Sequence, residues 1–503
     1  MPNLRLTGGI ALIVASAAGC GVVSSGAEAP LPSEPTMVDY VAPTAVRGLD
    51  VRTVSRRDPG GPEVHAAYPS VADAPRLTEE LRRTVTAQLG LFDRSVRADR
   101  KGTAGQPPHA EFNVDWQLTA ASKEVLGVRL RTGESAGGGW TESRTTVWYD
   151  RVDKRAMDSA GLLRDRAALT ELARLARRSL LSRGAAANPQ AVTPDPKIFD
   201  SIAFNMHGDL VVEFDDSQVG PGFLGRVAVA VPAGTAGPML SPTGLRAQRT
   251  AVEEAGRRAT APPPSSSLEE PNADRPKATS SRGGDVDCAK AKCVALTYDD
   301  GPGTGTAGLL DVLAAQGARA TFFCVGSSAV ARPDLLRRMT AEGHLVAGHT
   351  WSHRDLTAMS RNMIIDQLVR GRDAVAQAAG QVPTLVRPPY GRVGDQVTAA
   401  ARELGMPVVR WSVDTGDLDD DAPADVAARA VAGAARGAII LMHDTGGSAA
   451  EATAEVLRRL KAEGYTFVTV PELYGAQGMR PGVVYDSAES GERARTLGKQ
   501  TML

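Results

Sequence analysis

The sequence predicts an α/β protein whose C-terminal part is a distorted (β/α) barrel of about seven strands, preceded by a smaller α+β domain. Three observations support this prediction. From residue 293 onwards, short apolar segments alternate with helix-like segments, which is typical of parallel strands joined by right-handed crossovers. Before residue 246, helical periodicity mixes with alternating strands, as in an antiparallel sheet with helices packed on it. The 503 residues are also too many for one ordinary domain.

The composition is that of a folded protein without a bias toward charged partners. Hydrophobic residues make up 42% of the chain, which is enough for buried cores. The 57 Lys and Arg residues nearly balance the 58 Asp and Glu residues, so the formal net charge is -1. No basic block stands out, and we therefore expect no nucleic acid among the partners.

The N-terminus has the pattern of an export signal. A positive residue precedes a short apolar run at residues 10–15, and small residues follow. A run of this length is typical of a secretory signal peptide and is too short for a membrane-spanning helix. The tetrapeptide Ala17-Ala18-Gly19-Cys20 resembles a bacterial lipobox, which implies cleavage before Cys20 and a lipid on its sulfur.

We therefore expect residues 1–19 to be a lipoprotein-type signal peptide and residues 20–36 to be a tether, rich in Ser, Pro, Gly and Glu. This predicts an exported protein that a lipid anchor holds at the extracellular face of the cell membrane. If Cys20 is not lipidated, the protein is expected to be secreted.

Changes in composition divide the rest of the chain. Residues 37–245 predict the α+β domain, and residues 246–287, rich in Pro and Ser, predict a disordered linker that cannot bury a core. Residues 288–475 predict the barrel domain, and the polar residues 476–503 a flexible tail. In the first domain we expect helices at 77–100 and 162–181 and strands at 111–118, 125–130, 145–149, 210–214 and 227–231.

The cysteines fit an exported protein. Cys288 and Cys293 flank a short polar loop just before the first barrel strand, and in an oxidising compartment a local disulfide is expected there. A metal site is the weaker alternative, because no second Cys or His pair lies nearby. Cys324 lies in an apolar run and is expected to be a small buried residue.

The carboxyl ends of the expected barrel strands are rich in reactive side chains. We expect the strands at 293–298, 319–325, 345–349, 385–389, 407–413, 437–442 and 465–470. Reactive groups of such barrels lie at these ends. They are Asp299, Asp300, His349, His353, Arg387, Trp411, Asp414 and His443. A single His is more often a core or surface residue, but three of the chain's seven histidines lie here beside carboxylates and an Arg.

Asp300, His349 and His353 form a set of two imidazoles and one carboxylate. Such ligands suit Zn²⁺, and three protein ligands leave a position open for water, as a catalytic zinc site requires. Another divalent metal such as Co²⁺ would also fit. The same ligand set occurs in non-haem Fe(II) oxygenases. That alternative lacks support, because those sites lie on β-sandwich-like folds rather than on alternating strands and helices.

The remaining polar residues suggest acid–base chemistry. Asp299, beside the metal ligand, is placed to take a proton from water. Arg387 can hold that carboxylate in its ionised form. On the opposite rim His443 can act as the general acid, with Asp414 holding its imidazole charged and oriented. A base and an acid on two sides of a metal ion predict hydrolysis of an amide or an ester.

These five stretches, in this order and spacing, resemble the polysaccharide deacetylases of carbohydrate esterase family 4 over about residues 290–475. The resemblance implies that Asp299 is the base, that Asp300, His349 and His353 are metal ligands, that Arg387 positions the base and that His443 is the acid. It also implies substrate contacts for the backbone N–H of Tyr390 at the oxyanion and for Leu441 at the acetyl methyl group. Trp411 is expected to bind substrate beside them. Two residues depart from the family pattern: Tyr298 stands where Phe is usual, and Leu418 where Trp is usual.

A second resemblance concerns the first domain. Its Gly, Pro and apolar pattern at residues 208–214, 218–222 and 229–232 is similar to the extracellular domain of lysozyme-sensing anti-sigma factors, which implies a contact with lysozyme or glycan. Together the two resemblances predict a metal-dependent enzyme that removes N-acetyl groups from GlcNAc in cell-wall glycan, most of all peptidoglycan, and releases acetate. Two alternatives are O-deacetylation of a polysaccharide such as xylan, and a non-catalytic surface sensor of lysozyme or glycan.

Overall fold

The structure is a computed structural model that describes residues 38–57, 61–100, 110–136, 139–182, 187–221, 227–260, 286–418, 422–446 and 448–488. These residues belong to one compact unit. The expected signal peptide, Cys20 and the tether lie outside the described residues, as does most of the expected linker. Among the helices of the described ranges, none is both long enough and apolar enough to cross a membrane.

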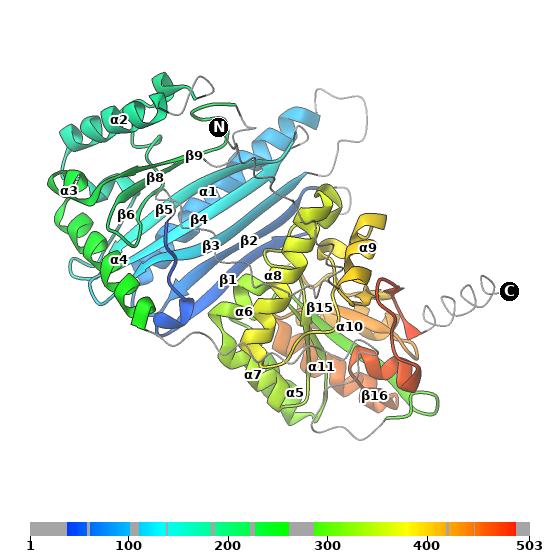
Figure 1. Cartoon of the computed structure of the whole chain (residues 1–503). Helices are drawn as coiled ribbons and strands as arrows, with labels where there is room; N and C mark the ends of the chain where they lie inside the picture. Colours follow the sequence, from blue (N-terminus) through cyan, green and yellow to red (C-terminus); the bar gives the residue numbers. More distant parts are fainter. Residues whose placement is uncertain are drawn as a thin grey trace, which may run out of the picture. The chain divides into compact units, whose positions relative to one another are not determined.

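A six-stranded sheet forms the base of the N-terminal domain, with the strand order β1-β2-β3-β4-β5-β6 (Figure 1). The strands are β1 (Leu49–Arg56), β2 (Glu63–Val71), β3 (Glu111–Ala121), β4 (Val125–Ser135), β5 (Thr141–Asp150) and β6 (Arg155–Met157). Neighbours are antiparallel except β2 and β3, which are parallel. A parallel pair needs a crossover connection, and here helix α1 (Pro75–Arg100) provides it and packs on one face of the sheet.

The second half of this domain covers the other face of the sheet. A small antiparallel sheet of β7 (Ile202–Phe204), β8 (Leu210–Phe214) and β9 (Val227–Val231) shares a core with α2 (Arg166–Leu181), α3 (Ala233–Ala236) and α4 (Pro242–Thr260). On β5, Trp148 belongs to this core, whereas Val147 and Tyr149 belong to the core beneath α1, as side-chain alternation along a strand requires. Because α4 continues to Thr260, the folded domain extends beyond the expected boundary at residue 245.

Strand β1, at the edge of the sheet, and its neighbour β2 are not among the strands expected from the sequence. They pair antiparallel, and Ser55 on β1 is the register partner of His65 on β2. β1 begins with apolar and charged residues in alternation, but the alternation shifts at Thr53 and Val54, and β2 is buried on both faces, so neither strand keeps the regular pattern of a half-buried strand. These two strands prove to be the part of the domain that contacts the functional site described below.

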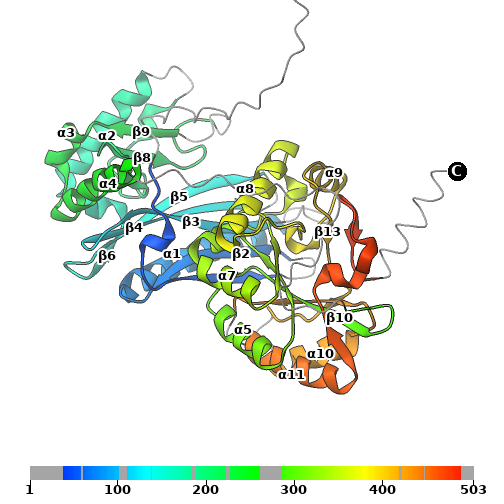
Figure 2. The same ribbon diagram turned by 60° about the horizontal axis from the view of Figure 1, so that its bottom comes forward.

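The C-terminal domain is a curled parallel sheet with helices outside it (Figure 2), which confirms the predicted distorted (β/α) barrel. Its strands are β10 (Lys292–Asp299), β11 (Thr321–Cys324), β12 (Leu345–Gly348), β13 (Val408–Val409), β14 (Val413–Asp414), β15 (Ile439–His443), β16 (Tyr465–Phe467) and β17 (Val484–Tyr485). Its helices are α5 (Thr306–Ala315), α6 (Gly326–Ala331), α7 (Pro333–Ala341), α8 (Arg361–Ala379), α9 (Asp395–Glu403), α10 (Pro423–Gly433) and α11 (Ala449–Ala462).

The sheet follows the order β12-β11-β10-β15-β14, and β16 also pairs with β10. Single bridges at Val386 join Gly348 of β12 to Val408 of β13 and continue the curve. The expected strand at 385–389 is therefore only a bridge, because Pro388 and Pro389 have no N–H to donate to a neighbour. The expected start of the flexible tail at residue 476 is also too early, because β17 lies after it and pairs with β13.

Strand β10 shows how the barrel directs its side chains. Val294, Leu296 and Tyr298 point outward into the core beneath the helices, whereas Cys293 and Ala295 point into the barrel. Asp299, the last residue of the inward series, therefore faces the barrel mouth. The departure from Phe at Tyr298 is accommodated on the outer side, because its hydroxyl lies 2.9 Å from the hydroxyl of Thr453.

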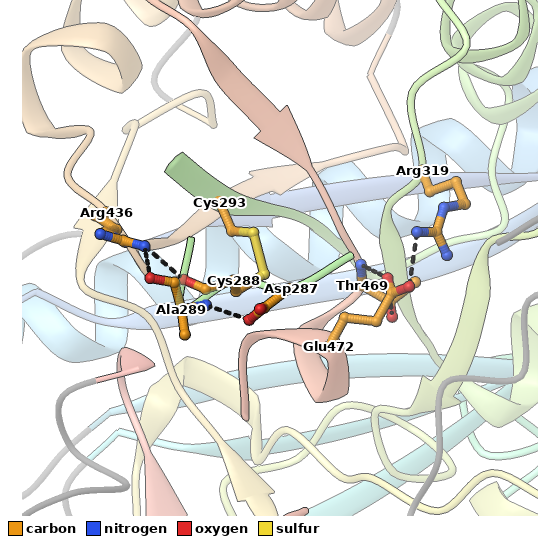
Figure 3. Close-up of a disulfide and its surroundings, with 8 residues drawn as sticks. All are labelled: Asp287, Cys288, Ala289, Cys293, Arg319, Arg436, Thr469 and Glu472. Atoms are coloured by element: carbon orange, nitrogen blue, oxygen red, sulfur yellow. Dashed lines mark hydrogen bonds and ion pairs between the residues drawn. A yellow bond between two sulfur atoms is a disulfide. The ribbon is translucent and has the colours of Figure 1, made fainter. Parts of the chain in front are cut away.

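The base of the barrel is closed by a disulfide between Cys288 and Cys293 (Figure 3). The loop between them is held to the barrel by Arg436, which donates 3.0 Å to the carbonyl oxygen of Cys288. Nearby, Arg319 pairs with Glu472 at 2.6 Å. These contacts fix the start of β10, whose other end carries the functional residues.

Candidate active site

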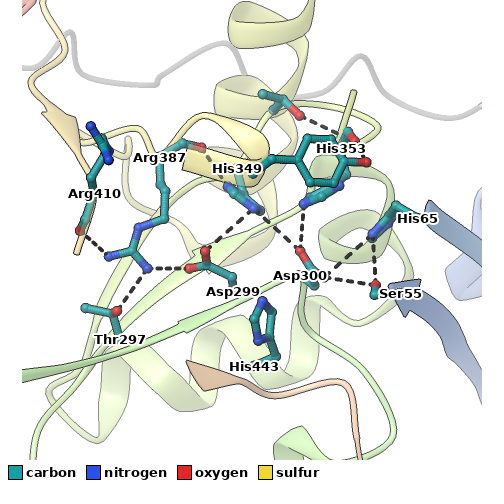
Figure 4. A network of polar contacts seen from close by, with 12 residues as sticks. Ser55, His65, Thr297, Asp299, Asp300, His349, His353, Arg387, Arg410 and His443 are labelled. Carbon is teal, nitrogen blue, oxygen red and sulfur yellow. Dashed lines mark hydrogen bonds and ion pairs between the residues drawn. The ribbon is translucent and has the colours of Figure 1, made fainter. Parts of the chain in front are cut away.

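Two neighbouring strands bring a carboxylate and an imidazole to the same edge of the barrel. β10 and β15 are parallel, and Asp299 at the end of β10 is the register partner of His443 at the end of β15. Carboxyl ends of parallel strands share one edge of a sheet, so the two side chains face the same space. Figure 4 shows this edge with the polar residues that surround it.

Asp299 is 3% exposed and is held by a buried arginine. Its Oδ1 accepts a hydrogen bond of 2.6 Å from Arg387, whose guanidinium also donates to the hydroxyl of Thr297 at 2.9 Å and to the carbonyl of Arg410 at 2.8 Å. The guanidinium lies 4.1 Å from the centre of the Phe323 ring. An unpaired buried carboxylate would be costly, so this ion pair offsets the burial of Asp299 and fixes the direction of its side chain.

The carboxylate of Asp300 faces two imidazoles. Its Oδ1 lies 3.0 Å from Nε2 of His353 and 3.5 Å from Nε2 of His349. Nδ1 of His349 lies 2.6 Å from the carbonyl oxygen of Arg387. A carbonyl can only accept, so Nδ1 of His349 carries a proton and Nε2 is the ring atom that faces the carboxylate. Burial lowers the pKa of His353 to about 3, so the ring of His353 is neutral near pH 7.

This arrangement fits a divalent cation. Asp300 Oδ1 is buried without a hydrogen-bond partner among the described residues, and a cation beside it would offset the cost of burying this oxygen. Ligand atoms about 2.0–2.2 Å from a zinc ion lie about 3.4 Å apart in a tetrahedral site, which is close to the distances found here. The hydrogen bond from His349 to a backbone carbonyl is the outer contact that orients ligating histidines. The structure thus brings together Asp300, His349 and His353, as the sequence predicts.

The backbone of the site is unusual. Asp300, Thr350, His353 and Tyr390 have φ angles of 74, 66, 56 and 59°, which are left-handed values for residues with a Cβ atom. They are four of the six such residues in the described ranges. Each left-handed residue costs about 1–3 kcal/mol and persists only where its surroundings determine it. Concentration of this strain at one place is typical of a functional site.

His443 is held by Asp417. Nδ1 of the imidazole lies 2.8 Å from Oδ1 of Asp417, and the backbone N–H of His443 donates to Oδ2 at 2.7 Å. Burial alone would lower the pKa of His443, but the charge and the hydrogen bond of Asp417 outweigh it and raise this pKa to about 10. The imidazole is therefore protonated near pH 7, as a general acid must be.

The expectation that Asp414 orients His443 is wrong. Its side chain is 45% exposed and pairs with Arg57 at 2.9 Å. The physical reason is that β14 ends at Asp414, so the chain continues over the rim and returns to the imidazole three residues later, at Asp417. The stretch that follows β14 does hold the imidazole of His443, but through Asp417 and not through Asp414.

A pocket opens at this edge of the barrel. Its lining includes the expected substrate residues Tyr390, Leu441 and Trp411, and Leu418, which stands where the family usually has Trp. Trp411 packs against Gly391, where a Cβ atom would lie 2.6 Å from the indole ring. The pocket therefore combines apolar walls with Asp299 and His443, which lie side by side at the ends of neighbouring strands and not on opposite rims as expected.

The lining also includes residues of the N-terminal domain, which the sequence analysis missed. Ser55, Arg57 and Val64 line the pocket, and His65 lies behind Asp300 with its ring stacked on that of His353. Ser55 and Asp300 are 245 positions apart in the chain. His65 lies in a segment with no motif, so the only available signal was the presence of a histidine in a strand of the accessory domain.

Several known proteins that are similar to this chain are named deacetylases. Residues 287–409 match the family model described as polysaccharide deacetylase. Over 185 residues the chain is 44% identical to the peptidoglycan-N-acetylglucosamine deacetylase PgdA of Listeria monocytogenes, covering 37% of this chain and 39% of that protein. It is 28% identical over 409 residues to the peptidoglycan-N-acetylmuramic acid deacetylase PdaC of Bacillus subtilis, covering 79% and 82%. A chitooligosaccharide deacetylase of Sinorhizobium fredii is 39% identical over 156 residues, covering 31% and 73%.

The C-terminal domain is a curled α/β barrel with carboxylates and histidines at its strand ends, where barrels of this kind hold their reactive groups. The chain belongs to the polysaccharide deacetylase family, because it covers more than two thirds of a relative to which it is 39% identical. It spans only 39% of the length of the PgdA relative, so this match covers the barrel rather than the whole protein.

Proposed function

We propose that the protein is a metal-dependent deacetylase that hydrolyses the acetamide of GlcNAc residues in peptidoglycan and releases acetate. One observation carries the proposal: Asp299, held by Arg387, and protonated His443, held by Asp417, line the same pocket as Asp300, His349 and His353.

A divalent cation held by Asp300, His349 and His353 would supply Lewis-acid polarisation of the acetyl carbonyl. Zn²⁺ is proposed, with Co²⁺ as a substitute, because nitrogen and oxygen donors suit both. Asp299 takes the proton of the attacking water, and its pairing with Arg387 fixes the direction of its side chain.

The leaving group receives its proton from a second residue of the pocket. His443 donates its proton to the sugar nitrogen as the carbon–nitrogen bond breaks, so that acetate and a free amine result. The Tyr390 N–H is proposed to bind the developing oxyanion. Leu441 lies two residues before His443 on β15 and is 1% exposed. It is proposed to contact the acetyl methyl group.

The names of the relatives support peptidoglycan as the substrate. PgdA, with the higher identity, is named for N-acetylglucosamine. PdaC is named for N-acetylmuramic acid, and its match covers 79% of this chain, including much of the N-terminal domain. N-acetylmuramic acid is therefore the second candidate. Mass spectrometry of digested peptidoglycan separates the two, because the deacetylated residue is glucosamine in one case and muramic acid in the other.

We also propose that the protein is exported and held at the outer face of the membrane by a lipid on Cys20. The lipobox-like segment supports this proposal, and a surface polymer as substrate agrees with it. In cell fractionation, the Cys20→Ala variant should move from the membrane fraction to the soluble or secreted fraction. An unchanged membrane fraction would refute the anchor.

Acetate release from N-acetylated peptidoglycan tests the proposed activity. We expect release with Zn²⁺ and none after chelation. Asp299→Asn should lower the rate about 10²–10⁴-fold, because a general base contributes that much, while the variant still binds the metal. His349→Ala should lose both metal and activity.

The control is His207→Ala, which removes an exposed histidine of the N-terminal domain. It should leave the rate unchanged. Release from acetylated xylan but not from peptidoglycan would support O-deacetylation instead. Binding of peptidoglycan without release from any acetylated polymer would support a non-catalytic sensor.

A further inference from the structure

One side chain of the N-terminal domain reaches the proposed metal ligands. His65 on β2 has a side chain that is 2% exposed, and its Nδ1 lies 3.6 Å from Oδ2 of Asp300. Its ring is stacked on that of His353 with 4.1 Å between the ring centres. Figure 4 shows His65 approaching Asp300 from the side opposite to His349.

His65 is one of three residues that could share a cation. The donor atoms of His65, Asp300 and His353 all lie within 4.8 Å of one another, and all three side chains are buried. Asp300 thus has an imidazole on each side: His349 and His353 near Oδ1, and His65 near Oδ2. His65 is therefore a fourth candidate ligand beside Asp300, His349 and His353.

Polar contacts between the N-terminal domain and the barrel hold His65 in position. Its register partner Ser55 donates 3.1 Å to Oδ2 of Asp300 and lies 3.3 Å from Nδ1 of His65. Two residues before His65, Glu63 pairs at 3.0 Å with Arg392 of the barrel. On the next strand, the amide of Asn113 donates 2.8 Å to the carbonyl of Ser352.

The same strand pair covers the place where a sugar would approach. Arg57 pairs with Asp414 at 2.9 Å and lies 4.7 Å from the centre of the Trp411 ring. Trp411 is the aromatic residue proposed to contact substrate, and its face is occupied here by a guanidinium. The N-terminal domain therefore takes up both the outer side of Asp300 and the aromatic wall of the pocket.

We propose that His65 is a metal ligand contributed by the N-terminal domain, and that it binds the cation in a closed form of the protein. In this form His65 takes a coordination position that water or the acetyl oxygen needs. The polymer can then reach the site only when β1 and β2 withdraw. This inference rests on the proposed metal site, and it makes the N-terminal domain a regulator of that site.

The test compares metal binding and activity in the full-length chain. We expect His65→Ala to weaken Co²⁺ or Zn²⁺ binding at least about tenfold in competition with a chelator, since the loss of an outer contact alone costs about that much. At saturating metal the same variant should release acetate faster than the wild type. A merely structural role of His65 would lower both quantities, so the opposite directions identify a blocking ligand. His207→Ala is the matched control.

The wild-type protein gives an independent readout. In the Co²⁺-loaded protein, each coordinating imidazole produces hyperfine-shifted ring resonances in the NMR spectrum. Three coordinating histidines are expected in the wild type, and two would overturn the inference even if His65→Ala failed to fold.

His349→Ala separates this inference from the proposed function. Metal affinity that depends on both His349 and His65 supports the inference. Affinity that depends on His349 alone overturns the inference and leaves the proposed site intact. Affinity that depends on neither residue overturns both.

Discussion

The pair of His443 and Asp417 sets the protonation of the acid side of the site. A general acid works only while it carries its proton, so activity should fall as the pH rises through the pKa of His443. Asp417 raises this pKa to about 10 and thereby keeps the acid form at neutral pH. Asp417→Asn removes the negative charge, so the pKa must fall.

The first prediction follows from this fall in the pKa of His443. In Asp417→Asn the alkaline limb of the kcat profile should move to lower pH, and kcat at neutral pH should fall about tenfold to a hundredfold. The measurement is acetate release as a function of pH. Asp414→Asn is the control, because Asp414 is half exposed, pairs with Arg57 and accepts from the N–H of Gly416 but does not contact His443 in any described hydrogen bond, so its alkaline limb should stay in place. If Asp414→Asn moved the limb and Asp417→Asn did not, the assignment of the imidazole partner would be reversed.

At the scale of elements, the start of β10 is fixed by the disulfide of Cys288 and Cys293, and its end carries Asp299. The two cysteines are five positions apart, so the bond closes a short loop. Loop-closure entropy for so short a loop amounts to about 2 kcal/mol. The disulfide should therefore stabilise the barrel without being part of its chemistry.

The double variant Cys288→Ser/Cys293→Ser tests this separation. We expect the free energy of unfolding to fall by about 2 kcal/mol in urea titrations, while metal affinity and acetate release at 25 °C stay unchanged. Reduction of the wild type should give the same shift in stability. A loss of metal affinity would show that the disulfide positions the far end of β10 as well.

Sequence patterns predict those parts of the site that lie on neighbouring strand ends. Asp299 and His443 follow apolar strands, and parallel strands bring their carboxyl ends to one edge, so their presence at one edge follows from the pattern. The pattern does not show that the two strands are direct neighbours, and His443 was expected on the opposite rim. The pattern fails where the chain leaves the strand, because a loop can return any of its residues to the site. Asp414, at the end of its strand, pairs with Arg57, whereas Asp417, in the loop that follows, holds His443. The prolines after Arg387 likewise indicate that the fourth strand is missing, because proline has no N–H to donate to a neighbouring strand.

At the scale of the whole molecule, the contact between the two domains could not be predicted. His65 meets Asp300 through tertiary structure alone, and β1 and β2 lack the strict alternation that would have identified them as strands. The similarity of the first domain to a lysozyme-sensing domain stays a prediction. The structure adds that this domain contacts the barrel next to the proposed metal ligands.

Arg392 is one of the residues that join the two domains beside the site. Its guanidinium pairs with Glu63 of β2 at 3.0 Å and with Asp355 of the barrel at 2.5 Å. The carboxylates are 7% and 4% exposed, so neither has water as a substitute partner. Glu63 lies two residues before His65, and Asp355 lies two residues after His353. Loss of the guanidinium should therefore loosen the contact that holds β2 over the site.

The last prediction concerns Arg392→Met, which keeps the aliphatic part of the side chain and removes the charge. Removing one partner from a buried pair costs up to about 3–5 kcal/mol, and less here because Arg392 is partly exposed. We expect faster deuterium uptake in residues 63–71, measured by mass spectrometry, and a higher rate of acetate release from polymeric peptidoglycan. Arg361→Met is the matched control, because its pair with Glu403 is half exposed on both sides and such pairs contribute little. If both variants behaved like the wild type, the domains would be held together by other contacts, and the closed form would not depend on this one.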